Sequence, residues 1–271
     1  HPDDETIATG GILAHYAAQG VQTVLVTCTR GEVGEIVDPT VATPETLPAV
    51  REAELRAACA RLNVGALHFL GYRDSGMMGT PENDDPRSFW RADLDEATGR
   101  LVALIRQYRP HVLVTYDENG FYGHPDHIQA HRITVAAFHA AADPRRYPEL
   151  DLPPWAPAKL YYSAVPRSRL VALEQRLREL NIPIEFGEDG EEPSFGTPDE
   201  RVTTMIDVRA HADLKREALM LHRSQVGVNH FFLTMPPDLW REAMGIEYYE
   251  RAASRVPAPP REHDLFLGVR P

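Results

Sequence analysis

The chain has 271 residues, of which 43% are hydrophobic and 25% charged, a composition typical of one large globular enzyme domain. Its formal net charge is −12, and no basic run is present. This argues against nucleic-acid binding, because contacts to phosphates supply most of that affinity. No stretch approaches the roughly 20 apolar residues of a membrane span.

Three further expectations concern the cellular location, the start of the native chain and the oligomeric state. Cys28 and Cys59 lie in apolar segments without a CxxC spacing, so we expect a reduced pair in a cytoplasmic protein. The chain starts at a motif rather than at methionine, and we therefore expect native residues, including a strand, before His1. A homo-oligomer is compatible with the sequence, which leaves the oligomeric state open.

Strand-like and helix-like segments alternate over about the first 165 residues. The first is a helix from the opening HPDDE to about residue 19. The strand-like runs are residues 21–29, 66–72, 111–116 and 159–165. Apolar residues spaced i, i+3, i+4 and i+7 predict two further helices, through Leu55, Ala58, Cys59 and Leu62 and through Leu94, Ala97, Leu101 and Leu104.

Apolar strands separated by amphipathic helices indicate an α/β protein with a Rossmann-like, doubly wound, mostly parallel sheet. We expect a single domain, with a core over about residues 1–182 and a C-terminal elaboration over about 183–271. In the C-terminal part we expect a loop or hairpin over 183–201, a strand over 201–207, a helix over 210–224 and a surface-wrapping tail from Val256. The apolar segment 231–249 is expected to cap the pocket or to form a subunit contact.

Imidazoles and carboxylates concentrate in two motifs, HPDDE at residues 1–5 and YGHPDH at residues 122–127. Each precedes a predicted helix, and each follows a strand that is either predicted or expected. In doubly wound sheets the loops at the carboxyl ends of strands form the ligand crevice. One such motif alone is more often a helix cap or a surface hydrogen bond. Two at equivalent strand ends point to a shared site.

Two imidazoles and one carboxylate form a ligand set that suits Zn²⁺ and leaves a coordination position open for water; Fe²⁺ is also compatible. A spare carboxylate can then accept the proton of the activated water. The two motifs together therefore predict metal-assisted hydrolysis.

The motifs resemble the LmbE-like, GlcNAc-phosphatidylinositol de-N-acetylase superfamily. The likeness extends over roughly residues 1–225 through GEVGE at 31–35, REAE at 51–54, RDSGM at 73–77 and HRSQ at 222–225. Within the superfamily the chain is similar to the mycothiol-pathway branch, which holds a deacetylase and an S-conjugate amidase. The subgroup stays open. YDENG resembles the amidase, but Thr6, Ile7 and Ala8 stand where the amidase branch carries a lysine.

The resemblance implies a role for each matching residue. The implied metal ligands are His1, Asp4 and His127. The implied catalytic residues are Asp3 as general base, His124 as oxyanion stabiliser and proton donor, Asp126 as the carboxylate that orients His124, and Tyr122 as a phenol that polarises the amide carbonyl. The implied contacts to sugar and polyol hydroxyls are Glu35, Arg51 and Asp74.

Other candidates rank lower. We expect His131 to be structural, although it stands at i+4 from His127. Asp117 and Glu118 either border the site or form a turn, Met77 and Met78 either line a substrate wall or fill gaps, and Gln225 either reaches the pocket or is structural. The remaining histidines, including His222, have no paired context and are expected to be structural or exposed.

The sequence thus predicts a zinc hydrolase that removes an acetyl group from an N-acetylglucosamine-type substrate. An amidase acting on a larger glucosaminyl amide is the alternative within the same class, and a catalytically inactive binding relative is a further one. A nucleotide-binding module is disfavoured, because neither GxGxxG nor GxxxxGK[ST] occurs in the chain.

Overall fold

The structure is a computed structural model that describes residues 1–182 and 195–269. The chain forms two compact units, each assembled from separate stretches of sequence. Unit 1 comprises His1–Asp74, Val165–Asp199 and Ile206–Glu247, and unit 2 comprises Ser75–Ala164, Glu200–Met205 and Tyr248–Pro271. The expectation of one domain with a core and a C-terminal elaboration stays a prediction.

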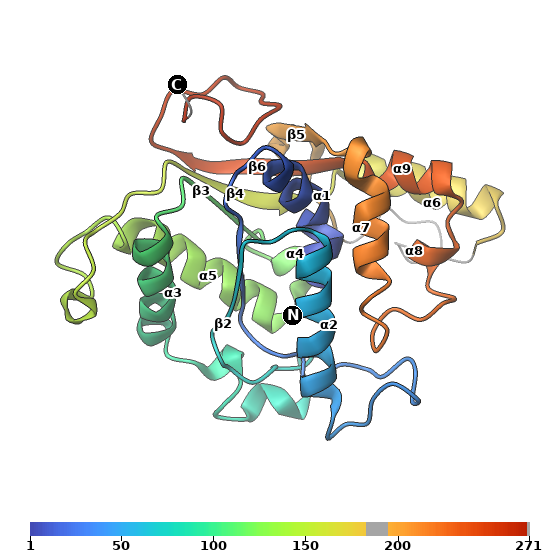
Figure 1. Ribbon diagram of the computed structural model, residues 1–271, viewed down its shortest axis with the longest axis horizontal. Helices are drawn as coiled ribbons and strands as arrows, with labels where there is room; N and C mark the ends of the chain where they lie inside the picture. Colours follow the sequence, from blue (N-terminus) through green and yellow to red (C-terminus); the bar gives the residue numbers. More distant parts are fainter. Residues whose placement is uncertain (183–194, 270–271) are drawn as a thin grey trace. The chain divides into compact units, whose positions relative to one another are not determined.

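Unit 1 contains a pair of short parallel strands, β1 (Val24–Thr27) and β2 (Ala66–Phe69), in register from Val24 with Ala66 onward. Helix α1 (Asp4–Ala18) precedes β1, and α2 (Leu47–Arg61) connects the two strands (Figure 1). Parallel strands need such a crossover, and β-branched residues such as those of β1 favour the extended backbone.

The helices of unit 1 pack through two apolar clusters. Alanines of α1, α2 and α7 (Ala212–Leu219) meet in the first, which allows these helices to approach closely. Its buried members are Ala14, Ala58, Ala218 and Leu62, the residue after α2. The second cluster surrounds the fully buried Trp240 and joins α6 (Arg167–Glu179), α7 and α9 (Pro237–Met244). The short helix α8 (Phe231–Thr234) packs against it.

Unit 2 contains a sheet in the order β3-β4-β6-β5, where β3 is Val112–Thr115, β4 is Lys159–Ala164, β5 is Thr204–Asp207 and β6 is Ile246–Ser254. The last residues of β5 and the first of β6 belong to unit 1. Strands β3 and β4 are parallel, whereas β4 and β6 are antiparallel. Helices α3 (Leu94–Tyr108) and α5 (Pro125–Ala140) lie side by side, and the short α4 (Gly120–Gly123) leads into α5.

The predicted α/β class is confirmed. The predicted strands lie where the sequence indicated, with shorter bounds, whereas α6 and β6 were not predicted. One helix face was misjudged. Leu94 is 44% exposed because it opens α3, and the buried face runs instead through Ala97, Leu101, Val102 and Ile105. The predicted helix over 210–224 ends as α7 at Leu219, and residues 222–225 continue as a turn. Of the loop expected over 183–201, residues 183–194 lie outside the described residues.

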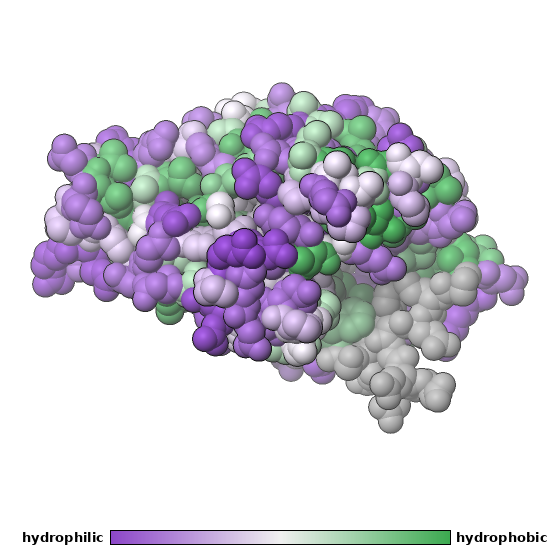
Figure 2. Space-filling view, turned by 90° about the horizontal axis from the view of Figure 1, so that it is seen from below, coloured by the Kyte–Doolittle hydropathy of each residue, from purple (hydrophilic) through white to green (hydrophobic). Residues whose placement is uncertain are grey.

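The face in Figure 2 is largely hydrophilic, and its hydrophobic residues stand in small separate groups. Within residues 1–182 and 195–269, no helix has the length and apolar character needed to cross a membrane.

Within unit 2, a buried ion pair joins the segment after β6 to β4. Glu262, 1% exposed, accepts a hydrogen bond from the fully buried Lys159 at 2.5 Å and from the Tyr161 hydroxyl at 2.8 Å. Arg251 contacts the same carboxylate at 2.8 Å. Burial raises the pKa of Glu262, but the bonds from Lys159, Arg251 and Tyr161 outweigh it and hold the pKa below its ordinary value.

Replacing this carboxylate is expected to destabilise the protein. Glu262→Gln leaves Lys159 buried without its counter-ion, which costs about 3–5 kcal/mol in the free energy of unfolding. Because the pKa of Glu262 is lowered in the folded state, its contribution is present above its ordinary pKa and disappears as the pH falls through the folded value. Urea denaturation of both proteins at neutral and acidic pH measures this. Glu96→Gln, which breaks an exposed pair with Arg100, is the control and should cost at most about 1 kcal/mol.

Candidate active site

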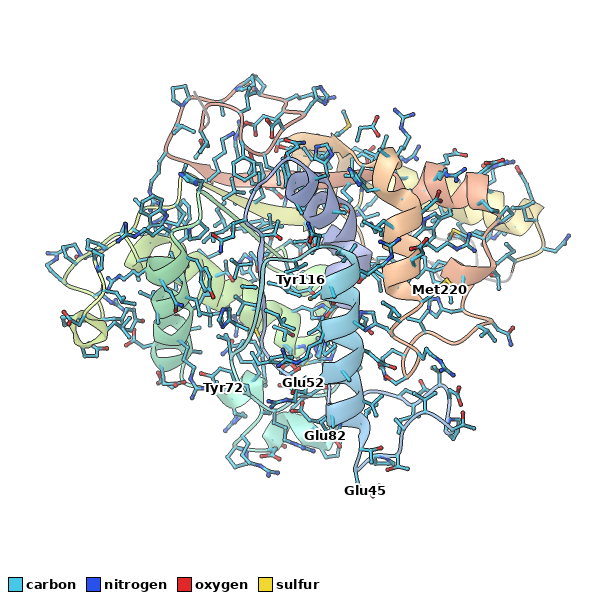
Figure 3. All side chains as sticks on the ribbon, in the orientation of Figure 1. Glu45, Glu52, Tyr72, Glu82, Tyr116 and Met220 are labelled. Carbon is cyan, nitrogen blue, oxygen red and sulfur yellow. The ribbon has the colours of Figure 1, made fainter. Side chains whose placement is uncertain are left out.

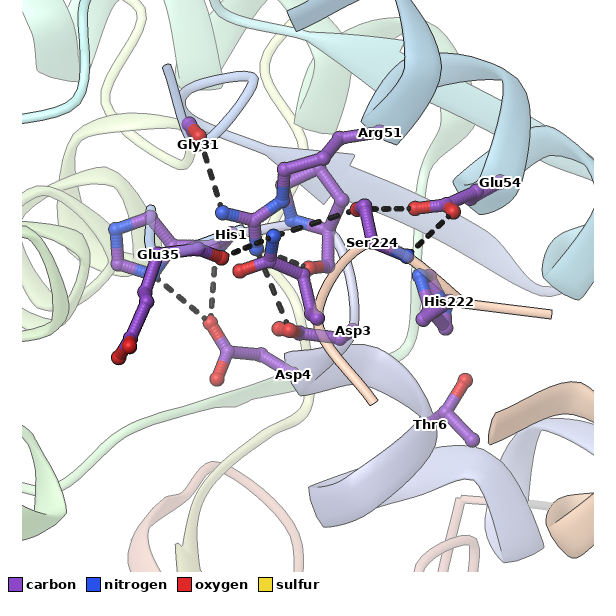
Figure 4. Close-up of polar contacts among 12 residues, drawn as sticks. His1, Asp3, Asp4, Thr6, Gly31, Glu35, Arg51, Glu54, His222 and Ser224 are labelled. Atoms are coloured by element: carbon purple, nitrogen blue, oxygen red, sulfur yellow. Dashed lines mark hydrogen bonds and ion pairs between the residues drawn. The ribbon is translucent and has the colours of Figure 1, made fainter. Parts of the chain in front are cut away.

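The opening residues of the chain bring an imidazole and a carboxylate together at the start of α1. His1 Nδ1 lies 3.2 Å from Asp4 Oδ2 (Figure 4). His1 Nε2 lies 3.5 Å from Asp74 Oδ1. The amino group of His1 also contacts Asp4 Oδ2, at 2.7 Å. Three of the predicted functional residues are therefore neighbours in unit 1.

Asp3 stands immediately before α1 with an unusual backbone, at φ 111° and ψ −34°. Its carboxylate makes no capping hydrogen bond to the helix, unlike Asp93, whose side chain accepts from the Glu96 N–H at the start of α3. Burial is the main cause that raises the pKa of Asp3 to about 7, and the neighbouring Asp4 adds to it while Arg51 opposes it. A carboxyl that titrates near neutrality suits general acid–base chemistry.

Arg51 supports this loop from α2. Its guanidinium donates to the Pro2 carbonyl at 2.6 Å, to the Gly31 carbonyl at 3.0 Å and to Asp3 Oδ2 at 3.3 Å. Gly31 has φ +67°, and a Cβ there would lie 2.1 Å from Arg51 Nη1, so only glycine fits this approach. Arg51 is 4% exposed, and its predicted contact with substrate stays a prediction.

The other two predicted substrate contacts also belong to unit 1. Asp74 is buried; its N–H donates to Glu32 at 2.9 Å, and its Oδ2 accepts from the Val33 N–H at 3.4 Å. The Glu35 side chain is exposed, and its carbonyl accepts from Gln225 at 3.0 Å. Gln225 thus contacts the backbone of the loop that carries Glu35.

His222 takes the structural one of the two settings expected from the sequence, and its partner is distant in sequence. Its Nε2 donates to Glu5 Oε1 at 2.9 Å, across 217 positions of sequence. Ser224 then donates from its N–H and hydroxyl to Glu54, at 2.8 and 2.6 Å (Figure 4). The HRSQ segment is therefore fixed against α1 and α2.

In unit 2, the second motif begins α5. His124 is the N-cap residue, and its Nδ1 accepts the Asp126 N–H at 3.1 Å, which leaves the proton of a neutral ring on Nε2. The Asp126 carboxylate accepts from the Ser75 N–H at 3.0 Å and from the Ser75 hydroxyl. The Trp90 N–H in turn donates to Ser75 Oγ at 2.8 Å. That Asp126 orients His124 through its carboxylate stays a prediction.

His127 is held by the loop that precedes α5. Its Nδ1 donates to the Gly120 carbonyl at 3.2 Å, so the lone pair of the neutral ring is on Nε2, the arrangement usual for a metal-binding histidine. Its ring stacks on Tyr116, the residue after β3, with a distance of 4.1 Å between the ring centroids. Tyr116 is labelled in Figure 3. Tyr122, 46% exposed, meets the same ring edge-on at 5.1 Å.

The loop carrying Tyr122 is itself constrained. Phe121 has φ 67° and ψ −66°, and the Asp117 carboxylate accepts its N–H at 2.8 Å. Asp117 thus shapes the turn, whereas Glu118 forms an ion pair with Arg201 at 2.8 Å.

Gly120 should tolerate no side chain. It has φ +63°, and an added Cβ would lie 2.6 Å from His127 Cβ, so Gly120→Ala must displace His127. Strain and overpacking together are expected to cost about 2–5 kcal/mol in the free energy of unfolding. Gly123 is the matched control. It has φ +90° but open space around the added Cβ, so Gly123→Ala should cost only about 1–2 kcal/mol. Chemical denaturation of both variants checks this, and equal losses would contradict the role of the contact.

The remaining candidates divide as follows. His131 Nδ1 donates to the Tyr116 carbonyl at 3.0 Å, and the ring faces Tyr162, a structural setting. Met77 and Met78 are 48% and 51% exposed. Glu5, Ser75 and Gly120 received no role from the sequence, although each stands within or beside a motif. Their place within or beside a motif was the only feature of the sequence that could have pointed to them.

Comparison with known proteins gives the family. The GlcNAc-PI de-N-acetylase family, PIG-L, matches residues 1–138. Two relatives are called 1D-myo-inositol 2-acetamido-2-deoxy-alpha-D-glucopyranoside deacetylase. The relative from Geodermatophilus obscurus is 46% identical over 99% of this chain and 95% of its own length. The relative from Acidothermus cellulolyticus is 47% identical over 99% and 92%.

Solved structures share the fold. N,N'-diacetylchitobiose deacetylase from Pyrococcus horikoshii matches with a TM-score of 0.60 at 19% identity, over 93% of this chain and 79% of its own. GalB, the 4-carboxy-2-hydroxymuconate hydratase from Pseudomonas putida, matches with a TM-score of 0.62 at 20% identity, over 96% and 95%. A hydratase with this fold means that the fold alone does not decide the reaction. The extent and identity of the sequence matches do decide the family: the chain belongs to the GlcNAc-PI de-N-acetylase (PIG-L) family.

Proposed function

We propose that this protein hydrolyses the acetamide of an N-acetylglucosamine-type substrate and releases acetate and the free amine. The observation that carries the proposal is the opening loop of unit 1, where a largely buried carboxyl with a pKa of about 7 stands beside a paired imidazole and carboxylate. The relatives named as deacetylases of an N-acetylglucosaminyl inositol support the same reaction and suggest that glycoside as the substrate.

The donor atoms fit a zinc ion. Ligands at about 2.0–2.1 Å in a tetrahedron stand roughly 3.3 Å apart, and His1 Nδ1 and Asp4 Oδ2 are separated by 3.2 Å. We propose His1, Asp4 and His127 as the ligands. The lone pair on His127 Nε2 supports the third assignment. Fe²⁺ would accept the same set. When bound, the metal supplies Lewis acidity and lowers the pKa of water to about 7.

The chain's own residues then divide the proton transfers. Asp3 takes the proton of the attacking water. His124, with its proton on Nε2, donates a hydrogen bond to the developing oxyanion. The proton that Asp3 accepted from the water then passes to the leaving amine, so that Asp3 and His124 both end the turnover in their starting protonation states. Tyr122, exposed on its loop, polarises the carbonyl, and Asp126 orients His124. Glu35, Arg51 and Asp74 contact the sugar and polyol hydroxyls.

An amine-release assay tests the proposal. The purified protein is incubated with an N-acetylglucosaminyl inositol, with N-acetylglucosamine and with a bulky S-conjugated glucosaminyl amide, while its zinc content is measured in parallel. Release of acetate with preference for the first substrate is expected. Preference for the bulky amide would identify an amidase instead, and no release by the zinc-loaded protein from any of the three would refute the proposal.

Other expectations from the sequence accompany this proposal. The Rossmann-like, doubly wound arrangement of a mostly parallel sheet stays a prediction, as do the single domain, a cytoplasmic location, the absence of nucleic-acid partners and a homo-oligomeric state.

A further inference from the structure

The backbone of Asp3 adopts a conformation that residues with a Cβ rarely adopt, at φ 111° and ψ −34°. Such a conformation persists only where surrounding contacts hold it, and it is often retained where function requires it. Removing those contacts should therefore let Asp3 relax and turn its carboxylate elsewhere.

Glu5 provides one of these contacts. Its Oε2 accepts the Asp3 N–H at 2.8 Å, while the Asp3 carbonyl accepts from the Thr6 and Ile7 N–H groups at 3.0 and 3.2 Å. Both peptide groups flanking the Asp3 Cα are therefore tied down. The helix holds the carbonyl side, and the Glu5 carboxylate holds the amide side.

His222 fixes Glu5 in turn. Its Nε2 donates to Glu5 Oε1 at 2.9 Å, and the Thr6 hydroxyl donates to the same oxygen at 2.5 Å. The ring is fully buried, and its Nδ1 has no hydrogen-bond partner within residues 1–182 and 195–269. Burying an unsatisfied ring nitrogen is costly. The hydrogen bond from Nε2 to Glu5 is therefore the interaction that offsets the cost of burying this imidazole.

The segment that carries His222 is rigidly attached. The Val226 N–H donates to the His222 carbonyl at 2.8 Å, and Ser224 is bonded twice to Glu54 on α2. In Figure 4 His222 lies beside Ser224 and Glu54, and Asp3 lies at the start of the same helix as Thr6. A link therefore runs from α2 through His222 and Glu5 to the Asp3 amide.

We propose that Glu5 and His222 are positioning residues that hold the general base Asp3 in its active conformation. This rests on the proposed function, in which Asp3 accepts the proton of the attacking water. Neither residue touches substrate in this role. Their loss should therefore lower kcat much more than it changes KM.

The test compares variants for kcat, KM and zinc content. Glu5→Ala and His222→Phe should each lower kcat about 100-fold, the effect of misplacing a catalytic group by an ångström, with KM and zinc content nearly unchanged. Glu5→Gln retains an oxygen for the Asp3 N–H and should recover most of the activity. Glu247→Ala is the control, because Glu247 is equally buried and accepts two α1 amides, those of Gly11 and Ile12, away from Asp3. Its kcat per folded molecule should stay within about threefold of the parent.

A stability cycle supplies a second readout that does not depend on activity. Glycine accepts a positive φ, so Asp3→Gly removes the strain that Glu5 holds in place. In the parent, Glu5→Ala also lets Asp3 relax, and the released strain offsets part of the lost hydrogen bond. The loss of melting temperature caused by Glu5→Ala should therefore be larger in the Asp3→Gly background than in the parent. Equal losses in both backgrounds, or a Glu5→Ala enzyme with parental kcat, would overturn the proposal. Asp3→Ala separates the proposed function from the positioning role. If Asp3→Ala retains activity, the proposed function fails. If Asp3→Ala is inactive while Glu5→Ala and His222→Phe keep the parental kcat, the positioning role fails.

Discussion

Replacing Asp3 by alanine is expected to lower kcat by roughly 10²–10⁴-fold, the usual contribution of a positioned general base, while zinc still binds. Its carboxylate makes no capping hydrogen bond to α1, so little helix stability depends on it. Burial and the adjacent Asp4 instead set its pKa near neutrality, where it can accept a proton at the working pH.

The measurement combines steady-state kinetics with metal analysis, and Asp93→Ala is the matched control. Asp93 is likewise the N-cap of a helix, but its side chain accepts a backbone N–H. Asp93→Ala should therefore cost about 1 kcal/mol of stability and leave kcat unchanged. If Asp3→Ala lost stability and kept its turnover, Asp3 would be an ordinary cap.

Replacing His127 by alanine is expected to release the metal. The proposed set has three protein ligands, and this substitution removes one of them. The lost ligand is the one whose lone pair the Gly120 carbonyl fixes on Nε2. Zinc bound per chain should fall well below that of the parent after dialysis, and activity should fall with it.

His131→Ala is the control for this loss. His131 stands one helical turn further along α5, and its Nδ1 donates to the Tyr116 carbonyl. It should retain zinc like the parent. Loss of zinc from His131→Ala together with retention by His127→Ala would mean that the ligand assignment on α5 is wrong.

The sequence predicted local features of the fold well. The β-branched run around Val24 and the apolar spacing from Leu55 to Leu62 became β1 and α2, because both depend on short-range periodicity. Likewise, HPDDE at the start of a helix was readable from residue type and order. The strand β6 was missed because IEYYERAAS mixes charged and apolar residues, as an antiparallel strand with one wet face does.

Long-range pairings were not predictable. Nothing local to His222 indicates that its ring meets Glu5, and nothing local to Lys159 indicates Glu262. Leu94 satisfied the helical spacing yet stayed exposed, since periodicity does not reveal where a helix begins relative to its neighbours. The division into two units also escaped prediction, because each unit draws on separate stretches of the chain.

The ion pair between Lys159 and Glu262 has a practical consequence for anyone shortening this protein. A version ending at Ser254, the last residue of β6, would look safe, since residues 255–269 form no helix or strand and are rich in proline. It would nevertheless leave an ammonium group sealed in the interior with its counter-charge deleted. We therefore regard the segment through Leu265, itself 2% exposed, as part of the minimal folding length of unit 2.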